Sequence, residues 1–585
     1  MQKKQTILVV ASLLIVVLSV TLAYFTAQII GKGKNVTINS ADLKIIFTDS
    51  DGSISGSNIE PGKWDVTKTF IIENKSNETY KYNIVIQDLV NTFVTNGYLQ
   101  YKITSTNGGY NMTEFKDVPK SSTPKDTILA YSASIDVGVT QSYTVEFIYK
   151  NDESVDQSED MGKTLSGKLF ITEGTINIYA GYEKGTLGYQ IMGDNPKRST
   201  RSNNNNGTND FATPLTTTTT GTLFTSTESI TGITDSPKEV YYYAGKTTNN
   251  WVKFGTFASD LVRGYYSATS TSHKEYTTLE ECNSASSYNT NCSYVWRKGD
   301  PMYWRIIRTN HDGSIRLLYA GTSPDTTEGN IGTSAFNASQ GSPKYAGYKY
   351  GEDTSLDTIR NNTTDSKIKT YIDTWYKNNL TNYTKYLSTS AVYCNDRNEG
   401  TGQTYNYASS PSSKFNFASY YRMDNDTKGA TANPSYNCTD KRDAFSVDNT
   451  SAKLDYPIAL MTADEIAFAG GVAKTKMNTP YAWFTINSVG SQVSTYYWWS
   501  LSPVWWGDEN SSSVWYWRFD SAYLNEGFVF VPCTVRPVLS LKSCTLHSTG
   551  DGSPENPYTI KETTSGCWWE NEKSLDPINL TVSND

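Results

Sequence analysis

Histidine is scarce in this chain of 585 residues, and cysteine is confined to its second half. The three histidines, His273, His311 and His547, lie far apart, and none of them begins an HExxH motif. None of the seven cysteines stands in a CxxC pair. These spacings argue against a zinc knuckle, a histidine-based metalloprotease site and a dithiol redox motif, so the sequence predicts no metal, no cofactor and no catalytic residue.

Basic patches are missing as well. The chain has 51 Lys and Arg against 59 Asp and Glu, a formal net charge of -8, and no cluster of basic residues on an aromatic background. Binding to a phosphate backbone depends on such local positive charge. Nucleic acid is therefore not an expected partner.

Aromatic and small polar residues are abundant instead. The chain contains 42 Tyr and 14 Trp, and aromatic residues make up 13% of it. A sequence with so much apolar ring surface can bury a core, which argues against disorder. The composition favours β-rich domains with polar, aromatic surfaces, and the length predicts about three or four domains.

The first 34 residues predict export. Lys3 and Lys4 precede an uncharged apolar run over residues 7–30, as in a secretory signal. The run is also long enough to span a bilayer, so cleaved signal peptide and retained membrane anchor are both open. In either case the sequence predicts an extracellular or cell-surface protein, attached to the membrane only if this segment is retained.

An exported chain can form disulfides. The cysteines are Cys282, Cys292, Cys394, Cys438, Cys533, Cys544 and Cys567. Pairing neighbours along the chain gives Cys282–Cys292, Cys394–Cys438 and Cys544–Cys567 and leaves Cys533 over. Spacing alone does not fix this connectivity.

Residues 35–175 predict a β-sandwich. Short runs that mostly alternate apolar and polar residues are separated by turn residues, as expected for half-buried strands. These runs lie at 36–47, 67–73, 80–86, 99–104, 128–135, 143–149 and 165–171. About seven such strands are typical of a sandwich. Asp49–Ser53 faintly matches a calcium loop but lacks the later glutamate, and a hairpin turn fits it better.

This region also resembles a known family. Ala23–Thr26 looks like the end of a SipW-type signal peptide, and Ser40–Leu43, Ile59–Gly62 and Phe70–Asn74 resemble the camelysin/TasA group of biofilm fibre proteins. The resemblance implies an exported jelly-roll-like sandwich, and some members of the group polymerise. Camelysin has been called a metalloprotease, but no metal-ligand spacing here carries that activity over.

Residues 176–235 predict a short helix and a linker. Leu187–Met192 suits a helix, whereas 202–207 and 214–221 are runs of Asn and Thr that cannot bury a core and should be extended or mobile. We expect the next domain to span 236–545 and a C-terminal tail to cover 546–585.

The 236–545 region mixes helices and strands. Residues 366–380 repeat apolar side chains at helical spacing, with Thr364 or Asp365 as cap, and Thr462 and Glu465 form a capping box. Residues 303–319 read as a β-hairpin, and Cys533–Leu541 reads as a closing strand.

Blocks around Tyr303, Tyr371, Leu460, Trp499 and the Val-Arg-Pro at 535–537 resemble bacterial surface modules similar to C-type lectin-like domains. The predicted fold class is thus multidomain: an all-β jelly-roll-like sandwich followed by an α+β C-type lectin-like domain. The same broad fold carries formylglycine-generating enzymes and the variable proteins of diversity-generating retroelements. In the variable proteins, the diversified positions lie shortly before a terminal strand. In this chain, the corresponding window of diversified positions would be residues 504–531.

Two features depart from the variable-protein pattern. Thr534 stands where those proteins usually have glycine. Tryptophan also cannot arise from asparagine codons by adenine mutagenesis alone, so the tryptophans of this window would need other template codons.

The densest aromatic segment, 496–537, is the predicted ligand-binding surface. Rigid aromatics mixed with Ser, Asn and Asp are typical of adaptable binding surfaces. The predicted ligand-binding residues are Trp505, Trp506, Asp508, Asn510, Trp515, Tyr516, Trp517, Arg518, Asp520, Tyr523, Asn525 and Phe528. The competing interpretation is that the tryptophans are fixed packing residues.

These observations predict a surface-displayed or secreted, adhesin-like binding protein rather than an enzyme. Its ligand would be an extracellular protein or a glycan. The first alternative is a structural biofilm or fibre subunit that self-assembles through the sandwich. A formylglycine-generating type of enzyme is the least favoured, because no second cysteine stands a few residues upstream of Cys533.

Overall fold

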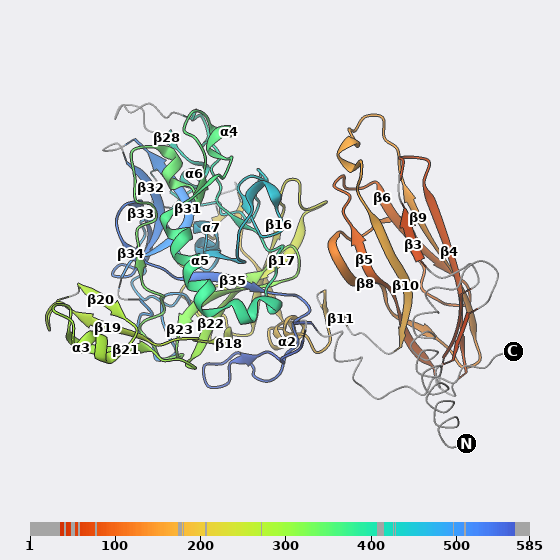
Figure 1. Cartoon of the computed structure of the whole chain (residues 1–585), viewed down its shortest axis with the longest axis horizontal. Helices are drawn as coiled ribbons and strands as arrows, with labels where there is room; N and C mark the ends of the chain where they lie inside the picture. Colours follow the sequence, from red (N-terminus) through yellow and green to blue (C-terminus); the bar gives the residue numbers. More distant parts are fainter. Residues whose placement is uncertain are drawn as a thin grey trace, which may run out of the picture. The chain divides into compact units, whose positions relative to one another are not determined.

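The computed structural model describes residues 36–567 with short gaps. The gaps are residues 40–42, 48–52, 57–58, 76–78, 174–177, 180, 205–207, 271, 406–414, 425, 427–428, 495, 508–510 and 565. The predicted signal or anchor and most of the candidate calcium loop lie outside the described residues. Within them, strands predominate, and no helix has the length and apolar character needed to cross a membrane. The chain divides into two compact units between residues 177 and 178 (Figure 1).

The first unit consists of two antiparallel sheets. One has the order β1 (Val36–Asn39), β2 (Leu43–Phe47), β4 (Asp65–Asn74), β9 (Thr140–Tyr149), β6 (Leu99–Ser105) and β7 (Lys116–Asp117). The other has the order β3 (Ser53–Gly56), β10 (Leu165–Glu173), β5 (Tyr80–Asn91) and β8 (Ser121–Ile135). A single buried apolar cluster draws residues from both sheets. The unit is therefore sandwich-like, as the sequence predicted.

Alternation along the strands builds this core. In β9, Tyr143, Val145 and Phe147 are buried while the residues between them are not. Ile84 of β5 and Leu169 of β10 face the same cluster from the second sheet. Side chains of a strand point alternately to opposite faces, so β9 buries one face and leaves the other more open. In β5 of the second sheet, the five residues from Tyr82 to Ile86 are all buried.

A nine-stranded sheet forms the larger layer of the second unit. Its main order is β13 (Lys197–Thr200), β16 (Thr222–Glu228), β17 (Lys238–Tyr242), β22 (Pro301–Thr309), β23 (Ile315–Gly321), β35 (Pro537–Leu541) and β30 (Ile458–Leu460). Strand β18 (Trp251–Thr256) also pairs with β22, and β36 (Tyr558–Thr559) pairs with β18. Strands β22 and β23 are the predicted hairpin.

A six-stranded sheet carries the aromatic segment, and its strands lie side by side in Figure 1. It contains β24 (Thr333–Ser334), β34 (Cys533–Thr534), β31 (Trp498–Trp506), β32 (Ser512–Arg518), β33 (Tyr523–Phe528) and β28 (Phe415–Asn416). The predicted closing strand is therefore divided between two sheets, as β34 and β35. Between them the buried Arg536 donates to the carbonyls of Tyr319 and Phe484, which holds the crossover in place.

The remaining elements are short. Further strands are β20 (His273–Tyr276), β19 (Leu261–Tyr265) and β21 (Thr290–Trp296) in one sheet, and the pairs β11 (Ile178–Tyr179) with β12 (Tyr182–Glu183), β14 (Asn203–Asn204) with β15 (Thr208–Asn209), β25 (Lys349–Tyr350) with β26 (Thr364–Asp365), and β27 (Tyr393–Cys394) with β29 (Ala444–Phe445). The 3₁₀ turns are η1 (Ser158–Asp160), η2 (Pro343–Ala346), η3 (Thr381–Tyr386) and η4 (Thr450–Ala452).

The predicted helices are present. They are α2 (Leu187–Asp194), α5 (Lys367–Asn379) and α7 (Ala463–Phe468), beside the shorter α3 (Leu279–Asn283), α4 (Leu356–Ile359) and α6 (Ala418–Met423). The capping box of Thr462 and Glu465 opens α7. The cap of α5 is Ser366, whose hydroxyl accepts from the Lys369 amide, because Thr364 and Asp365 are already paired in β26.

The prediction that the runs at 202–207 and 214–221 form an extended or mobile linker was wrong for the residues that the structure describes, which exclude 205–207. Strands β13 and β16 flank this segment and pair in parallel within the nine-stranded sheet. Phe211 packs edge-on against Phe468, with ring centroids 5.4 Å apart, and the Arg201 guanidinium lies 4.5 Å over the Phe211 ring. A few apolar anchors thus fix an otherwise polar run to the second unit.

The predicted C-terminal tail also belongs to the second unit as far as Cys567. Strand β36 pairs with β18, and His547 pairs with Ile560. A disulfide joins Cys544 to Cys567. The other two bonds are Cys282–Cys292 and Cys394–Cys438, so the neighbour pairing is the one found, and Cys533 is a free, buried thiol.

Candidate functional site

The tryptophans of the predicted binding surface are buried, so the expectation that they face solvent was wrong. Their exposed fractions are 5% for Trp505, 0% for Trp506, 0% for Trp515 and 1% for Trp517, and Tyr516 is 8% exposed. The competing interpretation, fixed packing residues, describes these rings. They cannot touch a partner without rearrangement of the fold.

Cover on both faces of the sheet explains this burial. All nine residues of β31 are buried, as are six of the seven in β32. Helices α6 and α7 pack against β31, and η2 packs against β31 and β32. The Trp515 indole donates to Ser419 of α6 at 3.2 Å, and the Trp517 ring meets Phe484 edge-on at 4.7 Å.

The other predicted residues lie closer to solvent. Arg518, Tyr523, Asn525 and Phe528 are half-buried and Asp520 is exposed, whereas Asp508 and Asn510 lie outside the described residues. Rings that were not predicted join some of these at one end of the sheet. We define the aromatic rim as Tyr496, Tyr497, Arg518, Phe519, Asp520 and Tyr523.

Stacking and one ion pair organise the aromatic rim. The Arg518 guanidinium binds both carboxylate oxygens of Asp520, at 2.7 and 3.0 Å, and lies over the rings of Tyr497 and Tyr523 at 5.4 and 5.7 Å. Tyr497 stacks on Tyr516 with centroids 5.0 Å apart. The hydrogen bond from Arg518 lowers the pKa of Asp520 below its usual range. The rim is thus electrically balanced and held against a buried sheet.

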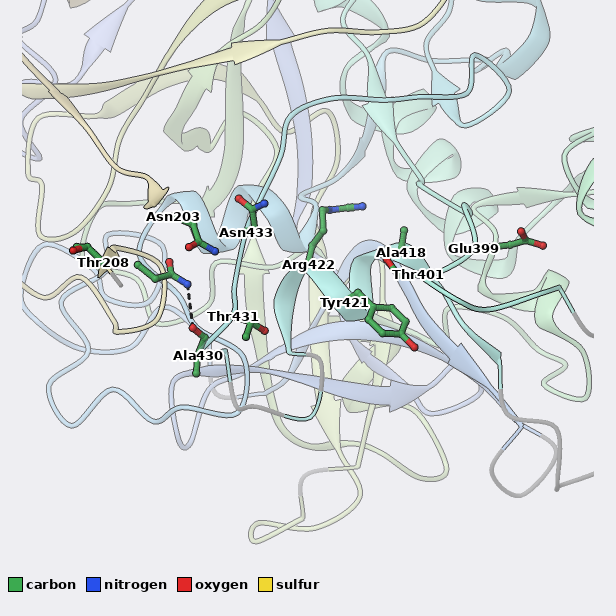
Figure 2. A pocket seen from close by; sticks show the side chains of 11 residues that line it. Asn203, Thr208, Glu399, Thr401, Ala418, Tyr421, Arg422, Ala430, Thr431 and Asn433 are labelled. Atoms are coloured by element: carbon green, nitrogen blue, oxygen red, sulfur yellow. Dashed lines mark hydrogen bonds between the residues drawn. The ribbon is translucent and has the colours of Figure 1, made fainter. Parts of the chain in front are cut away.

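A polar cavity of about 630 Å³ is the second candidate site (Figure 2). It lies between the β14–β15 hairpin, the segment at 399–401, helix α6 and the segment at 430–433. Its lining comprises Asn203, Thr208, Asn209, Glu399, Thr401, Ala418, Tyr421, Arg422, Ala430, Thr431 and Asn433. No local sequence pattern marks this cavity, because its amides and hydroxyls come from four separate segments.

The charge of Arg422 is neutralised within the cavity wall. Its guanidinium binds both oxygens of Asp464, at 2.9 and 3.0 Å, and one oxygen of Asp396 at 2.6 Å. Burial alone would lower the pKa of Arg422, but the two carboxylates outweigh it and raise the pKa. The guanidinium is therefore committed to these acids.

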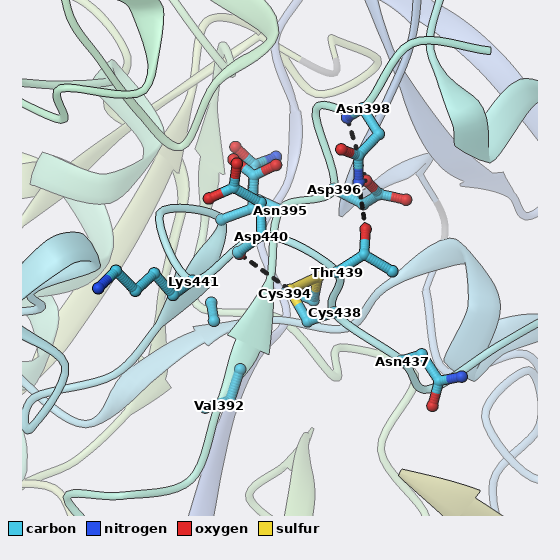
Figure 3. Close-up of a disulfide and its surroundings, with 12 residues drawn as sticks. Val392, Cys394, Asn395, Asp396, Asn398, Asn437, Cys438, Thr439, Asp440 and Lys441 are labelled. Carbon is cyan, nitrogen blue, oxygen red and sulfur yellow. Dashed lines mark hydrogen bonds between the residues drawn. A yellow bond between two sulfur atoms is a disulfide. The ribbon is translucent and has the colours of Figure 1, made fainter. Parts of the chain in front are cut away.

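The Cys394–Cys438 disulfide joins two segments that lead into the cavity walls (Figure 3). Beyond Cys394 the chain runs to Glu399 and Thr401, and the segment at 430–433 runs on to Cys438. Next to the disulfide, the Asn398 amide donates to the Thr439 hydroxyl at 2.7 Å. The walls of the cavity are thus cross-linked close to the site.

A buried ion network lies in the core of the second unit. Arg308 of β22 binds Glu228 at 2.8 Å and Glu465 at 2.9 Å, and Arg316 of β23 also binds Glu465. His311 lies 3.4 Å from Glu228. Burial would lower the pKa of His311, but the neighbouring carboxylates of Glu228 and Asp312 outweigh burial and raise it. Every acid is matched by a base, which fits a structural role.

The acidic trio Asp365, Asp373 and Asp455 has the spacing of a metal site, with ligand oxygens within 4.8 Å of one another. The buried ammonium of Lys369 occupies its centre, at 3.0, 2.5 and 2.8 Å from the three carboxylates. This cation fills the place that a metal ion would take.

Cys533 is the remaining candidate for chemistry. Burial raises the pKa of its thiol to about 12. A neutral, buried thiol is a poor nucleophile and a poor metal ligand.

No protein-family model matches this chain, and no curated protein is significantly similar to it. The two family resemblances found in the sequence therefore remain predictions.

Proposed function

We propose that this chain is a surface-displayed or secreted, adhesin-like binding protein that holds its partner through the aromatic rim of the second unit. One observation carries the proposal: half-exposed aromatic rings and an arginine stack on one another and on Tyr516 of the buried strand β32. Tyr and Arg are the usual hot-spot residues of binding surfaces. Their prior ordering lowers the entropy lost on binding.

The proposal includes the two folds predicted from the sequence. The first unit would be a jelly-roll-like sandwich, and the second a C-type lectin-like domain. The two-sheet core of the first unit and the mixed helices and sheets of the second support them. If the 504–531 window is diversified, tolerated changes concentrate at its half-exposed positions, because substitution of its buried tryptophans costs stability.

Export is part of the same proposal. Three disulfides are compatible with an extracellular protein. The partner is an extracellular protein or a glycan, and the Tyr, Phe and Arg side chains of the rim favour a protein.

Photo-cross-linking on intact producing cells tests the proposal. A benzophenone amino acid replaces Tyr496, which is 43% exposed, or Tyr266, which is 64% exposed and lies outside the rim. Cross-links to a second molecule are expected from position 496 and not from position 266. In the position-496 protein, Arg518→Ala should weaken the cross-link because it removes the support of two rim tyrosines. Equal cross-linking from both positions contradicts the proposal.

A fibre subunit is the alternative, favoured by one feature of the first unit. Strand β8 spans 15 residues at the edge of its sheet, and such an edge can pair with another chain. Its first half contains Pro124, Lys125 and Asp126, residue types that protect edges, so Thr127–Ile135 is the part suited to pairing. If this alternative holds, the substitution Thr127→Pro should abolish fibre formation by the full chain, because proline has no backbone N–H to donate to a neighbouring strand.

A formylglycine-generating activity is the weakest candidate. It would need a reactive cysteine pair, whereas Cys533 is buried with a raised pKa and the other six cysteines are in disulfides.

A further inference from the structure

The polar cavity has a chemistry that the aromatic rim does not share. We propose that it binds a neutral oligosaccharide, at a site separate from the rim. Its volume of about 630 Å³ falls within the range of small-molecule sites, enough for a short sugar chain. The proposal goes beyond the binding function above, because none of its residues belongs to the rim.

The hydrogen-bonding groups of the cavity suit hydroxyls. The side chains of Thr208, Thr401 and Asn433 line it and make no hydrogen bond to any other residue that the structure describes. Hydroxyl and amide groups both donate and accept, which is also true of every sugar hydroxyl. A polyhydroxylated ligand can therefore satisfy both partners of each contact.

The side-chain amides that the β14–β15 hairpin brings to the cavity are held in place by hydrogen bonds to the opposite wall. Asn203 donates to the Ala432 carbonyl at 3.1 Å, and Asn209 donates to the carbonyls of Ala430 and Ala432 at 3.1 and 2.9 Å. These bonds hold the β14–β15 hairpin against the 430–433 segment. Together with the Cys394–Cys438 bond, they fix the walls before a ligand arrives, which reduces the ordering cost of binding.

Tyr421 supplies the one aromatic surface in the cavity lining. Its ring lies against Gly400, where a Cβ would come within 2.3 Å of the ring atom Cε2, so a larger residue at position 400 would displace the ring. Its hydroxyl accepts from Gln403 at 3.0 Å, which leaves its own proton to donate. An aromatic face carries partial negative charge and attracts the slightly positive C–H face of a sugar ring.

The charges select against anions. The two negative charges of Asp396 and Asp464 exceed the single positive charge of Arg422. Glu399 adds a further, exposed carboxylate. A ligand carboxylate, sulfate or phosphate would meet net negative charge with no free cation among the lining residues. A neutral sugar is therefore favoured over an acidic one.

The experiment measures calorimetric binding of the full exported chain at pH 7. The probes are three neutral trisaccharides, maltotriose, cellotriose and chitotriose, with trigalacturonic acid as the acidic counterpart. We expect saturable binding of at least one neutral trisaccharide. We expect trigalacturonic acid to bind at least about tenfold more weakly, because its carboxylates are repelled by the negative charge around the cavity. A tenfold loss of affinity corresponds to about 1.4 kcal/mol.

Variants locate the sugar. Tyr421→Ala should lower the affinity for the neutral trisaccharide by about tenfold, because the ring face is lost. Asn433→Ala should lower this affinity by about threefold, because one hydrogen bond is lost. Asn433 is exposed, so its variant keeps the test valid even if Tyr421→Ala perturbs the fold. Tyr496→Ala in the rim is the matched control and should leave sugar binding unchanged.

Several outcomes overturn the proposal. They are no binding of any neutral trisaccharide, equal binding of the acidic one, and unchanged binding in both cavity variants. Loss of sugar binding in Tyr496→Ala would place the sugar on the rim and also overturn it. Failure of the rim proposal, in contrast, appears as equal cross-linking from positions 496 and 266 and leaves the sugar measurements unaffected.

Discussion

Two neighbouring parts of one sheet meet opposite surroundings. Strands β31 and β32 hold Trp499, Trp506 and Trp515 in the core, whereas Tyr496, just before β31, and Tyr523, at the start of β33, reach solvent. Both regions are rich in aromatic rings and small polar residues. The difference comes from cover: α6, α7 and η2 pack against β31, and η2 also packs against β32, whereas the rim residues lie before β31 and between the end of β32 and the start of β33. Composition therefore identifies an aromatic sheet, but the neighbouring elements decide which rings are available for binding.

The largest expected effect tests the buried side of this comparison. Trp515→Ala and Trp517→Ala should each lower the free energy of unfolding of the second unit by about 3–5 kcal/mol, because each leaves a cavity in a closed core. Urea unfolding followed by near-ultraviolet circular dichroism measures the change. Combined alanine substitution of Trp505, Trp506, Trp515 and Tyr516 should prevent folding. A folded quadruple variant would show that these rings are not core.

The buried ion network should give the next largest effect. Glu465 accepts from Arg308 and Arg316 and also caps α7, the helix that packs on β31. Glu465→Gln leaves two buried guanidinium groups with one fewer counterion, which should cost about 3 kcal/mol of stability. Urea midpoints measure it, with the exposed Glu239→Gln as control. Equal midpoints for the two variants would show that cover by α7 does not depend on this network.

The sandwich could be predicted because strands such as β9 bury one face and leave the other more open to solvent. Residues 143–149 alternate in the sequence, and Tyr143, Val145 and Phe147 alternate in burial. The capping box at Thr462 and Glu465 was equally visible, since caps are local interactions. Local patterns of this kind survive in any tertiary surrounding.

The second unit was harder to predict for a physical reason. Strand β31 is buried on both faces, so no alternation distinguishes its core side from a solvent side. The polar run at 202–221 resembles a linker, yet Phe211 and Leu215 anchor it to elements far along the chain. The polar cavity combines four separate segments, one of them about 190 residues from the others, and no local pattern marks such a meeting point.

His311 provides a smaller, pH-dependent test of the covered core. Its pKa is raised above 6.5 because Glu228 and Asp312 outweigh burial and Arg308. The folded state then holds more protons than the unfolded state above pH 6.5, so stability should fall as pH rises through the folded pKa. The slope cannot exceed about 1.4 kcal/mol per pH unit for one proton. Urea midpoints from pH 5.5 to 9 measure it, and His311→Gln should remove this slope. An unchanged slope in the variant would assign the dependence to another group.

The smallest effect on stability is expected at the rim, where the effect on binding is largest. Tyr496 is 43% exposed, so Tyr496→Ala should change the free energy of unfolding by less than about 0.5 kcal/mol. Its loss should nevertheless weaken partner binding about tenfold, since hot-spot rings contribute at least about 1.4 kcal/mol. Binding to the partner identified by cross-linking measures the second quantity, and urea unfolding the first. A large loss of stability would make the rim part of the core, and the distinction between the buried strands and the rim would disappear.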